Sequence, residues 1–387
     1  MKNLFLFLIT LFLISSCSKE EENNDNPNDV IQISTLQVTN ITSESSKFSA
    51  SMVGSNSNYQ TGFCWGTTST PTINSDNYIL VGNATSNNFS SQVNNLTPNS
   101  SYYVRAFATN FSNTIYGNAV SFNTLNPIST LNAKNITTTT AILKGHIDQI
   151  GSANNEVGFV CSTSPNPTIN NVVNSTVIIG TADFELLVNN LNYNTVYYYR
   201  SYLNKNGNYS YGEQKQFKTT GYFGPAGGYV AYDTGLDFYQ QNGWRYLEVN
   251  PQPLPDFPNG NGIEWGSLTT SGGSYVNGLS QEFGTGYTNT QIIASNITST
   301  NCAAKYCLNF VKNGYDDWFL ASSEEGLIIA LSLGNVNLAG IVHCWTSSQD
   351  SNPSAYIVEY GTVSQPPYIT TSPKSSSNLY TFPVRRY

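Results

Sequence analysis

The chain has 387 residues, which is enough for two to four domains. Only 10% of the residues are charged while 13% are aromatic, a balance typical of short strands joined by turn-rich connections in an extracellular, mainly β protein. The net charge of -8 disfavours a nucleic-acid partner, and the two histidines cannot form a histidine cluster for zinc, so we expect no metal and no cofactor.

Residues 1–16 have the pattern of a bacterial export signal. Lys2 is followed by an apolar stretch at 4–14, which is shorter than the roughly 20 residues that a membrane-spanning helix needs. The segment ends at Ile14-Ser-Ser-Cys17, which resembles a lipobox. The resemblance implies cleavage before Cys17, attachment of lipid to its thiol, and outer-membrane lipid as a partner. An ordinary signal peptide with a coincidental cysteine is the alternative.

Residues 17–30 have the composition of a flexible tether that follows the lipidated cysteine. They are polar, include a proline and contain no cluster of apolar residues that could form a core. Lys19 precedes three glutamates, which resembles the surface-export signal of Bacteroidetes lipoproteins. The alternative is a solvated charge run. The resemblance predicts an outer-membrane, lipid-anchored protein that is exposed at the cell surface.

An internal repeat covers residues 31–125 and 126–220. Ile33-Ser-Thr-Leu36 returns as Ile128-Ser-Thr-Leu131, and several later motifs return at a similar offset of about 95 residues. Each copy contains short alternating runs of strand-forming residues at regular spacing. This pattern predicts two tandem β-sandwiches.

Each repeat resembles a fibronectin type III domain near its centre. In the first copy Leu96-Thr-Pro precedes Tyr102 and an alternating strand, and Tyr197 is equivalent in the second copy. The resemblance implies that Tyr102 and Tyr197 form tyrosine corners, in which the hydroxyl bonds to the backbone. The tryptophan usual on an early strand of the family is absent from both copies. Neither repeat has a catalytic constellation, so we expect both to act as spacers.

The composition changes at about residue 221, and we assign 222–387 to a separate head domain. The expected order is strands at 227–233 and 243–249, a mostly helical segment at 289–311 that stops at Gly314, a helix at 327–331, and strands at 355–360 and 380–387. Ser322 and Glu325 have the spacing of a capping box at the start of the second helix.

Several motifs of the head resemble the DUF1566-type domain found at the end of the Legionella collagen-like adhesin. They are Gly-Tyr-Asp-Asp-Trp-Phe-Leu at 314–320, Ser-Ser-Glu-Glu at 322–325, Trp-Thr-Ser-Ser at 345–348 and Pro-Val-Arg-Arg at 383–386. Ala321 replaces a usual proline, and Gly326 interrupts a usual Glu-Leu pair. The resemblance implies an α+β, C-type-lectin-like domain. The expected fold is therefore mainly β, with two fibronectin III-like sandwiches followed by this head.

The layout also resembles the formylglycine-generating enzyme superfamily, whose members use two cysteines near the end of the fold. No cysteine follows Cys344, so that chemistry lacks its nucleophile. We therefore expect no enzymatic activity. Cys302, Cys307 and Cys344 leave one disulfide open as a possibility, and the sequence does not assign its partners.

The distinctive residues of the head have a structural and a functional interpretation. For Asp317 and Glu325 the alternatives are a calcium or sugar site and, favoured here, backbone bonding at the turn and helix capping. Trp318 and Trp345 suit the core better than a sugar platform. Arg385 is expected to form a buried ion pair, with ligand contact as the alternative.

Ligand contact is best placed on the tyrosine- and asparagine-rich loops between residues 239 and 287. The candidates are Trp265, Tyr275, Asn277 and Tyr287, because aromatic faces beside amides suit glycans and protein surfaces. We expect a surface lipoprotein that acts in adhesion or binds glycans or a host or other extracellular protein. The alternatives are an accessory or catalytic part in extracellular polysaccharide use, and an inert cap.

Overall fold

The computed structural model describes residues 31–387 except 55, 86, 149–153, 180–181, 255–261, 267–274, 336–341 and 361–365. The predictions for the export signal, Cys17 and the tether lie outside the described residues. Among the residues described, none of the helices combines the length and the apolar character needed to cross a membrane. The chain is mainly β, and its internal contacts divide it into two compact units, residues 1–124 and 125–387.

The first unit holds the first repeat, which is a sandwich of two antiparallel sheets. Its strands are β1 (Gln32–Thr35), β2 (Ser46–Val53), β3 (Asn56–Gly66), β4 (Asn77–Ala84), β5 (Asn88–Val93), β6 (Ser101–Thr109), β7 (Thr114–Tyr116) and β8 (Val120–Asn123). One sheet has the order β1-β2-β5 and the other β4-β3-β6-β7, with β8 on β6. Alternate residues such as Phe48, Phe63 and Val104 point into the space between the sheets and form its core.

The second repeat folds in the same way at the start of the second unit. Its elements are β9 (Ile128–Ile136), β10 (Ala141–Ile147), β11 (Asn154–Ser162), the short 3-10 helix η1 (Ile169–Asn171), β12 (Val172–Ile179), β13 (Ala182–Val188), β14 (Val196–Lys205), β15 (Asn208–Tyr211) and β16 (Lys215–Lys218). The two copies match in detail. Arg105 Nε donates to Gly117 O at 3.0 Å, and Arg200 Nε donates to Gly212 O at 2.9 Å.

The tyrosines of the two repeats occupy the same structural position. Tyr102 Oη accepts a hydrogen bond from the Thr97 N–H at 3.0 Å, and Tyr197 Oη accepts one from the Asn192 N–H at 2.9 Å. Both side chains are largely buried, and each ring stacks on a phenylalanine of the last strand of its repeat. Each hydroxyl thus ties the loop five residues upstream to the core, which is the geometry expected of a tyrosine corner.

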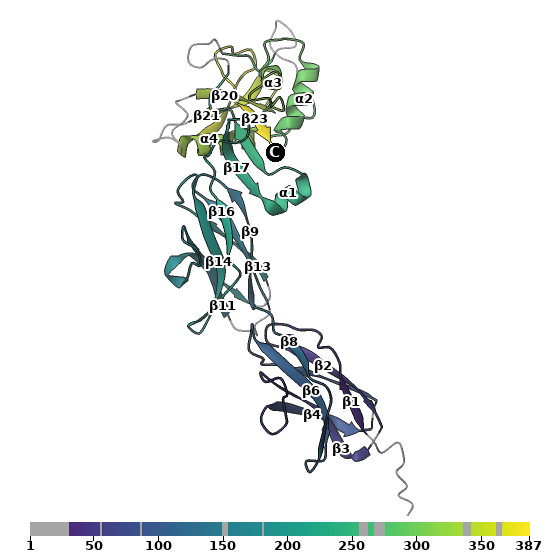
Figure 1. The fold of residues 1–387 in the computed structure, drawn as a ribbon. Coiled ribbons are helices and arrows are strands. Elements are labelled where there is room, and N and C mark those ends of the chain that lie inside the picture. Colours follow the sequence, from purple (N-terminus) through teal and green to yellow (C-terminus); the bar gives the residue numbers. More distant parts are fainter. Residues whose placement is uncertain are drawn as a thin grey trace, which may run out of the picture. The chain divides into compact units, whose positions relative to one another are not determined.

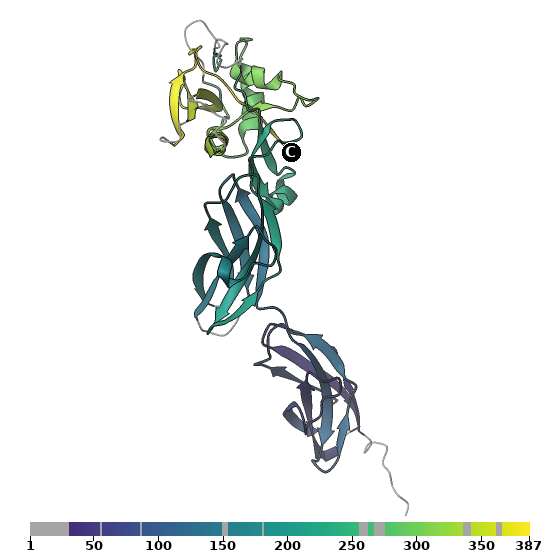
Figure 2. The ribbon, with the colours of Figure 1, turned by 60° about the vertical axis from the view of Figure 1, so that its left-hand side comes forward.

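The head follows the second repeat and contains most of the helix among the described residues. Its elements are β17 (Tyr229–Gly235), α1 (Leu236–Asn242), β18 (Tyr246–Val249), α2 (Gly286–Asn296), α3 (Ala303–Leu308), β19 (Phe319–Leu320), α4 (Ser323–Asn335), β20 (Val342–Gln349), β21 (Ser354–Tyr360), β22 (Tyr368–Pro373) and β23 (Pro383–Arg386). In Figure 2 the sheet β20-β21-β22 lies on one side of the head and the green helices α2 and α3 on the other.

One sheet joins the second repeat to the head. Its order is β13-β10-β9-β17-β18-β23-β19, so β9 of the repeat is the neighbour of β17 of the head (Figure 1). The two strands are antiparallel, with Ile136 opposite Asp233 and Lys134 opposite Gly235. The boundary expected at about residue 221 therefore falls between strands of the same sheet.

The helical segment expected at 289–311 is two shorter helices, so this expectation needs correction. Helix α2 ends at Asn296 because Ile297 is extended, with φ -89° and ψ 123°. The intervening residues are rich in Ser, Thr and Asn, which favour turns over helix. Helix α3 ends at Leu308, so Gly314 does not stop it. With φ 84°, Gly314 instead forms the turn closed by the bridge between Lys312 and Tyr315.

Candidate functional site

Two acidic side chains of the head converge on Arg385. Its Nε and Nη2 donate to the two oxygens of Asp317 at 2.8 and 2.9 Å, and its Nη1 donates to Glu248 at 3.1 Å. The guanidinium carbon lies 4.2 Å from the ring centre of Tyr315 and 5.0 Å from that of Tyr387. The expected buried ion pair of Arg385 is confirmed. Asp317 was expected to bond to the backbone of the turn, whereas both of its oxygens accept from Arg385.

Glu248 is the partner that the sequence did not reveal. Its side chain is completely buried on β18, and it accepts hydrogen bonds from the N–H groups of Gly228 at 2.7 Å and Ala226 at 3.4 Å. A Cβ on Gly224 would lie 2.5 Å from the Glu248 carboxyl carbon. The glycine-rich stretch at 224–228 is therefore needed so that backbone can approach this carboxylate. The only sequence signal was that cluster of glycines.

Ser322 and Glu325 form the expected capping box at the start of α4. The Ser322 N–H donates to Glu325 Oε2 at 2.8 Å, and the Glu325 N–H donates to Ser322 Oγ at 3.3 Å. Glu325 Oε1 also accepts from the Gly284 N–H at 3.1 Å, which ties the loop before α2 to α4. Burial raises the pKa of Glu325 above its ordinary value. These contacts give Glu325 a structural role.

Trp318 and Trp345 lie in the core, as the sequence predicted. Both side chains are almost completely buried. Trp318 Nε1 donates to Tyr315 O at 3.0 Å, and Trp345 Nε1 donates to Ile263 O at 2.7 Å. Neither ring offers a face to a sugar.

Trp265 was predicted to contact a ligand, and the structure contradicts this. The side chain has 0% exposure, and its Nε1 donates to Thr346 O at 2.8 Å. One ring face is covered by Lys374, whose Nζ lies 4.6 Å from the ring centre. Trp265 therefore packs against Lys374 and does not reach solvent.

Lys374 and Gln349 form a hydrogen-bonded clamp that holds the loop at 275–278. Lys374 Nζ donates to Gln349 Oε1 at 2.8 Å, and the same oxygen accepts the Val276 N–H at 3.1 Å. Gln349 Nε2 donates in turn to Val276 O. Burial lowers the pKa of Lys374 to about 8. The amide of Gln349, which the sequence did not single out, thus satisfies both backbone groups of Val276.

The clamp presents Tyr275 and Asn277 to solvent. Val276 is 2% exposed and points inward, whereas Tyr275 is 56% exposed and Asn277 is also exposed. Because the residue between them is fixed at both backbone groups, these two side chains project from a held backbone. A loop whose backbone is already held loses less conformational entropy when it meets a ligand.

Tyr287, the fourth ligand candidate, belongs to a different neighbourhood on α2. Its ring is 38% exposed and lies 5.0 Å from the guanidinium carbon of Arg386. Arg386 Nη1 donates to Gly284 O at 3.2 Å, and its guanidinium also faces Trp244 at 5.5 Å. Tyr287 and Arg386 thus form a cationic aromatic pair at the surface, held by the loop before α2.

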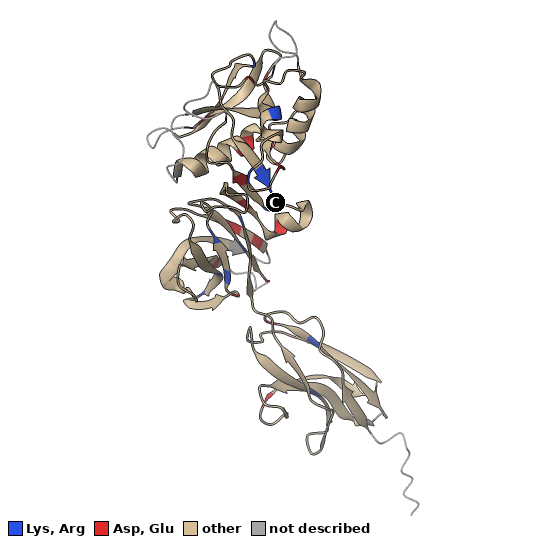
Figure 3. Cartoon of the chain, turned by 45° about the horizontal axis from the view of Figure 1, so that its top comes forward, with Lys and Arg blue, Asp and Glu red and all other residues tan. Residues whose placement is uncertain are grey.

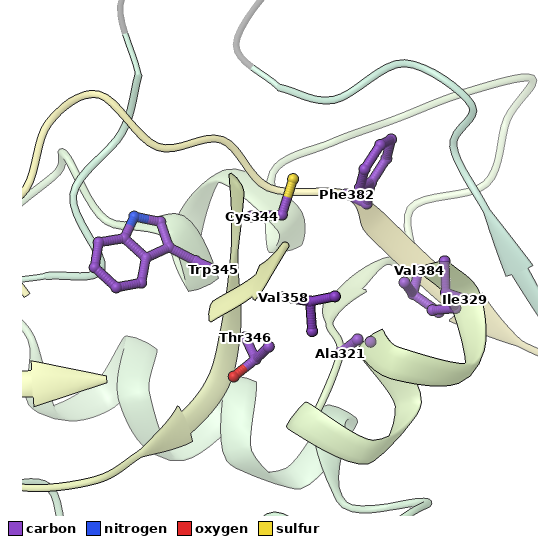
Figure 4. A pocket seen from close by; sticks show the side chains of 9 residues that line it. Ala321, Ile329, Cys344, Trp345, Thr346, Val358, Phe382 and Val384 are labelled. Atoms are coloured by element: carbon purple, nitrogen blue, oxygen red, sulfur yellow. The ribbon is translucent and has the colours of Figure 1, made fainter. Parts of the chain in front are cut away.

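A cavity in the head core is too small to be a ligand site. It lies among α4, β20, β21 and β23 and is lined mainly by apolar side chains (Figure 4). Its free volume is about 10 Å³, which is the space of about one water molecule. The hydroxyl of Thr346, on its wall, already donates to Tyr356 O at 2.9 Å. Across the described part of the chain, no three His, Cys, Asp or Glu side chains are grouped to hold a metal ion.

The cysteines of the described residues are all free and buried, so the disulfide left open by the sequence is not formed. They are Cys64, Cys161, Cys302, Cys307 and Cys344. Burial raises the pKa of the Cys307 thiol to about 12. A buried thiol with a raised pKa is a poor nucleophile, so these side chains act as small apolar residues.

No protein-family model and no curated protein matches the chain. Among solved structures, it is similar to the sensor domain of the anti-sigma factor RsgI4 in Pseudobacteroides cellulosolvens, with 21% identity over 24% of this chain and 73% of that one and a TM-score of 0.21. It is also similar to a two-domain fibronectin type III segment of chicken tenascin, with 14% identity over 48% and 99% of the chains and a TM-score of 0.22. It is also similar to the FN1–FN3 domains of chicken CNTN1, with 8% identity over 45% of this chain and 60% of that one and a TM-score of 0.19.

Proposed function

We propose that this protein is a lipid-anchored surface protein whose head binds an extracellular glycan or protein, with two fibronectin III-like domains as spacers. The observation that carries the proposal is the exposed pair Tyr275 and Asn277 on a loop that Gln349 clamps at Val276. An aromatic face beside an amide, on a backbone already held in place, has the chemistry of a binding surface.

The same proposal assigns the head to the DUF1566-type, C-type-lectin-like domains. The motif residues support this by their roles: Ser322 and Glu325 cap α4, Trp318 and Trp345 fill the core, and Arg385 joins β23 to the turn at Asp317. In this assignment the motif builds the scaffold and the loops carry the ligand. Lipid at Cys17 would hold the protein to the outer membrane.

Binding to arrays of glycans and to immobilised extracellular-matrix proteins tests this function. The chain from residue 18 to 387 is compared with Tyr275→Ala and Asn277→Ala, each measured with and without a chelator. We expect at least one ligand class to bind, and Tyr275→Ala to weaken it by about tenfold or more, which corresponds to about 1.4 kcal/mol.

A matched control is Tyr209→Ala, which removes a tyrosine of the second repeat that is 39% exposed. Binding should be unchanged by it. Absence of binding to every glycan and matrix protein would overturn the proposal. Equal loss of binding in Tyr275→Ala and Tyr209→Ala would show that the loop at 275–278 is not the contact. Cleavage of a saccharide by the purified chain would favour a catalytic role instead.

A further inference from the structure

Phe111, in the turn between β6 and β7, is an exposed aromatic residue in an unusual backbone conformation. It is 64% exposed, and its φ of 67° lies in the left-handed region, which bulky residues seldom adopt. Every other described non-glycine residue with a positive φ is an asparagine. Neither burial nor local conformational preference therefore explains a phenylalanine at this position.

Hydrogen bonds hold Phe111 in this conformation. Its N–H donates to Thr109 Oγ1 at 2.9 Å. Asn110 Oδ1 accepts from the N–H groups of Ser112 at 3.1 Å and of Asn113 at 2.7 Å. The Asn110 N–H donates in turn to Asn113 O at 3.1 Å. The exposed ring of Phe111 is thus carried by a backbone that is fixed on both sides.

The turn lies at the end of the first repeat where the chain enters it. A small buried cluster marks this end: Ile31, Met52, Ala84 and Ala108. Ile31 precedes β1, and the other three are the last or next-to-last residues of β2, β4 and β6. Tyr59 packs against the cluster and accepts a hydrogen bond at 3.2 Å from Asn113 Nδ2 of the turn. Phe111 and the entry point of the chain are therefore at the same end of the sandwich.

Val53 is a second exposed apolar side chain at this end. It is the last residue of β2, lies opposite Gln32 of β1 and is 69% exposed. The second repeat has polar residues at both positions, because the offset of about 95 residues places Asp148 at the position of Val53 and Asn206 at that of Phe111. Asn206 also has a left-handed conformation, with φ 55°, which asparagine tolerates well. Of the two copies, only the first has apolar side chains at these positions.

The charged residues of the first repeat lie away from this end. Between residues 31 and 124 they are Glu44, Lys47, Asp76 and Arg105, and Figure 3 shows how few they are. Glu44 and Lys47 are at the start of β2 and Asp76 precedes the start of β4, whereas the end that carries Val53 is where both strands stop. Arg105 is in the middle of β6. This end can therefore enter an apolar environment without burying a charge.

The chain that precedes Ile31 indicates what this end faces. The sequence predicts lipid on Cys17, which is 14 residues earlier. A chain of that length reaches about 20 Å when flexible and at most about 50 Å when fully extended, so a lipid there keeps this end close to the bilayer. The equivalent end of the second repeat follows the first repeat in the chain, not an anchor, and it is polar at both positions.

We propose that Phe111 and Val53 enter the surface of the lipid bilayer that holds the anchor, and so direct this end of the first repeat towards the membrane. The proposal rests on the lipid anchor of the proposed function but not on a ligand of the head. Apolar side chains gain free energy at the boundary between headgroups and acyl chains. Because the anchor already holds the domain at the bilayer, the contact is intramolecular and needs little affinity of its own.

Fluorescence quenching by brominated lipid tests the contact. The chain from residue 17 to 387 is coupled through the Cys17 thiol to a maleimide lipid, in vesicles of phosphatidylcholine that is brominated near the head of its acyl chains. The cysteines of the described residues are buried and should not compete. This linkage supplies an anchor whether or not cells attach lipid to Cys17. Failure of the contact is therefore distinguishable from failure of the anchor or of ligand binding by the head.

Tryptophan is introduced at the two apolar positions, and the emission of the unsubstituted chain, which has five tryptophans of its own, is subtracted. We expect brominated lipid to quench about half or more of the emission that Phe111→Trp adds, because the ring should lie within the lipid surface. Val53→Trp should behave in the same way and keeps the test valid if Phe111→Trp does not fold. The matched control is Asn206→Trp, at the equivalent turn position of the second repeat, and its added emission should not be quenched.

The quenching should persist at high salt, because the contact is apolar and screening weakens only charge attraction. Its loss at high salt would overturn the proposal. Added emission that is not quenched in either Phe111→Trp or Val53→Trp, or that is quenched equally in Asn206→Trp, would overturn it as well. In sedimentation velocity, the chain from residue 18 to 387 should be monomeric. Dimers that Phe111→Asn abolishes would assign this end to a second copy instead of lipid.

Discussion

Arg245 donates two hydrogen bonds to Asp233, from Nε to Oδ1 at 2.7 Å and from Nη2 to Oδ2 at 2.8 Å. Asp233 lies on β17 opposite Ile136 of the second repeat, and its Oδ1 also accepts the Gly235 N–H at 2.8 Å. The carboxylate is buried, whereas the guanidinium is partly exposed. The pair thus fixes β17, the strand of the head that pairs with the second repeat.

Loss of this pair should destabilise the second unit. Arg245→Met leaves the buried Asp233 carboxylate without its cation, and we expect a loss of about 3 kcal/mol in the free energy of unfolding. Urea denaturation followed by tryptophan fluorescence measures it, because four of the five tryptophans lie in the head. The control is Lys134→Met, which breaks a more exposed pair with Glu185 and should cost less than about 1 kcal/mol. Equal losses in the two variants would contradict the structural role of Asp233.

Two glycines that flank α1 should respond differently to substitution. Gly235 and Gly243 both have positive φ, 97° and 75°, but only Gly235 is crowded, by Ala133 O and Lys134. Gly243→Ala should cost about 1 kcal/mol from strain alone. Gly235→Ala should cost clearly more, because its φ and ψ of 97° and 165° suit almost no residue but glycine and because its Cβ must push β17 away from β9. Thermal unfolding measures both variants, and similar melting temperatures would mean that β9 and β17 are not closely apposed.

Lys374 should give the second unit a distinctive alkaline pH dependence. Burial lowers its pKa from 10.5 to about 8, so between these values the unfolded chain binds more protons than the folded one. Stability contributed at this site is therefore complete above the unfolded pKa and is lost as the pH falls towards 8. We expect Lys374→Met to remove this rise in stability between pH 8 and 10.5. Urea midpoints at several pH values measure it, with exposed Lys205→Met as the control, and an unchanged pH profile in Lys374→Met would contradict it.

Cys17→Ala tests the anchor that the sequence predicts. If the Cys17 thiol carries lipid, the variant should move from the membrane fraction to the soluble fraction after cell lysis, because the acyl chains supply the membrane affinity. Ser18→Ala changes the neighbouring residue and should leave the protein with the membranes. Immunoblotting of the two fractions measures the distribution. Retention of Cys17→Ala in the membrane fraction would show that the lipobox interpretation is wrong.

Local patterns predicted much of the architecture. The repeat offset, the capping box of Ser322 and Glu325, and the core positions of Trp318 and Trp345 all follow from spacing or from residue type. The buried ion pair of Arg385 was expected in kind, but Glu248 was not foreseen as a member. Its partners are distant in the sequence, and a single acidic residue on a strand does not show what lies beside it.

The sequence could not predict which strands pair when they are distant in the chain. The sequence at 227–233 indicates that a strand forms but does not say that β9 of the preceding repeat is its neighbour. The same limit explains the loop at 275–278. Composition favoured Tyr275 and Asn277 as exposed contacts, but it also favoured Trp265. The burial of Trp265 depends on Thr346 of β20 and on Lys374 in the turn after β22, both much later in the chain.

The continuous sheet between β9 and β17 has a mechanical consequence. A pull on the head would reach the second repeat by two routes in parallel: the covalent chain at about residue 221, and the backbone hydrogen bonds that β17 makes with β9. Hydrogen bonds of antiparallel strands lie perpendicular to the strand direction, so a load along the strands is shared among them. The head should therefore resist tension together with the second repeat.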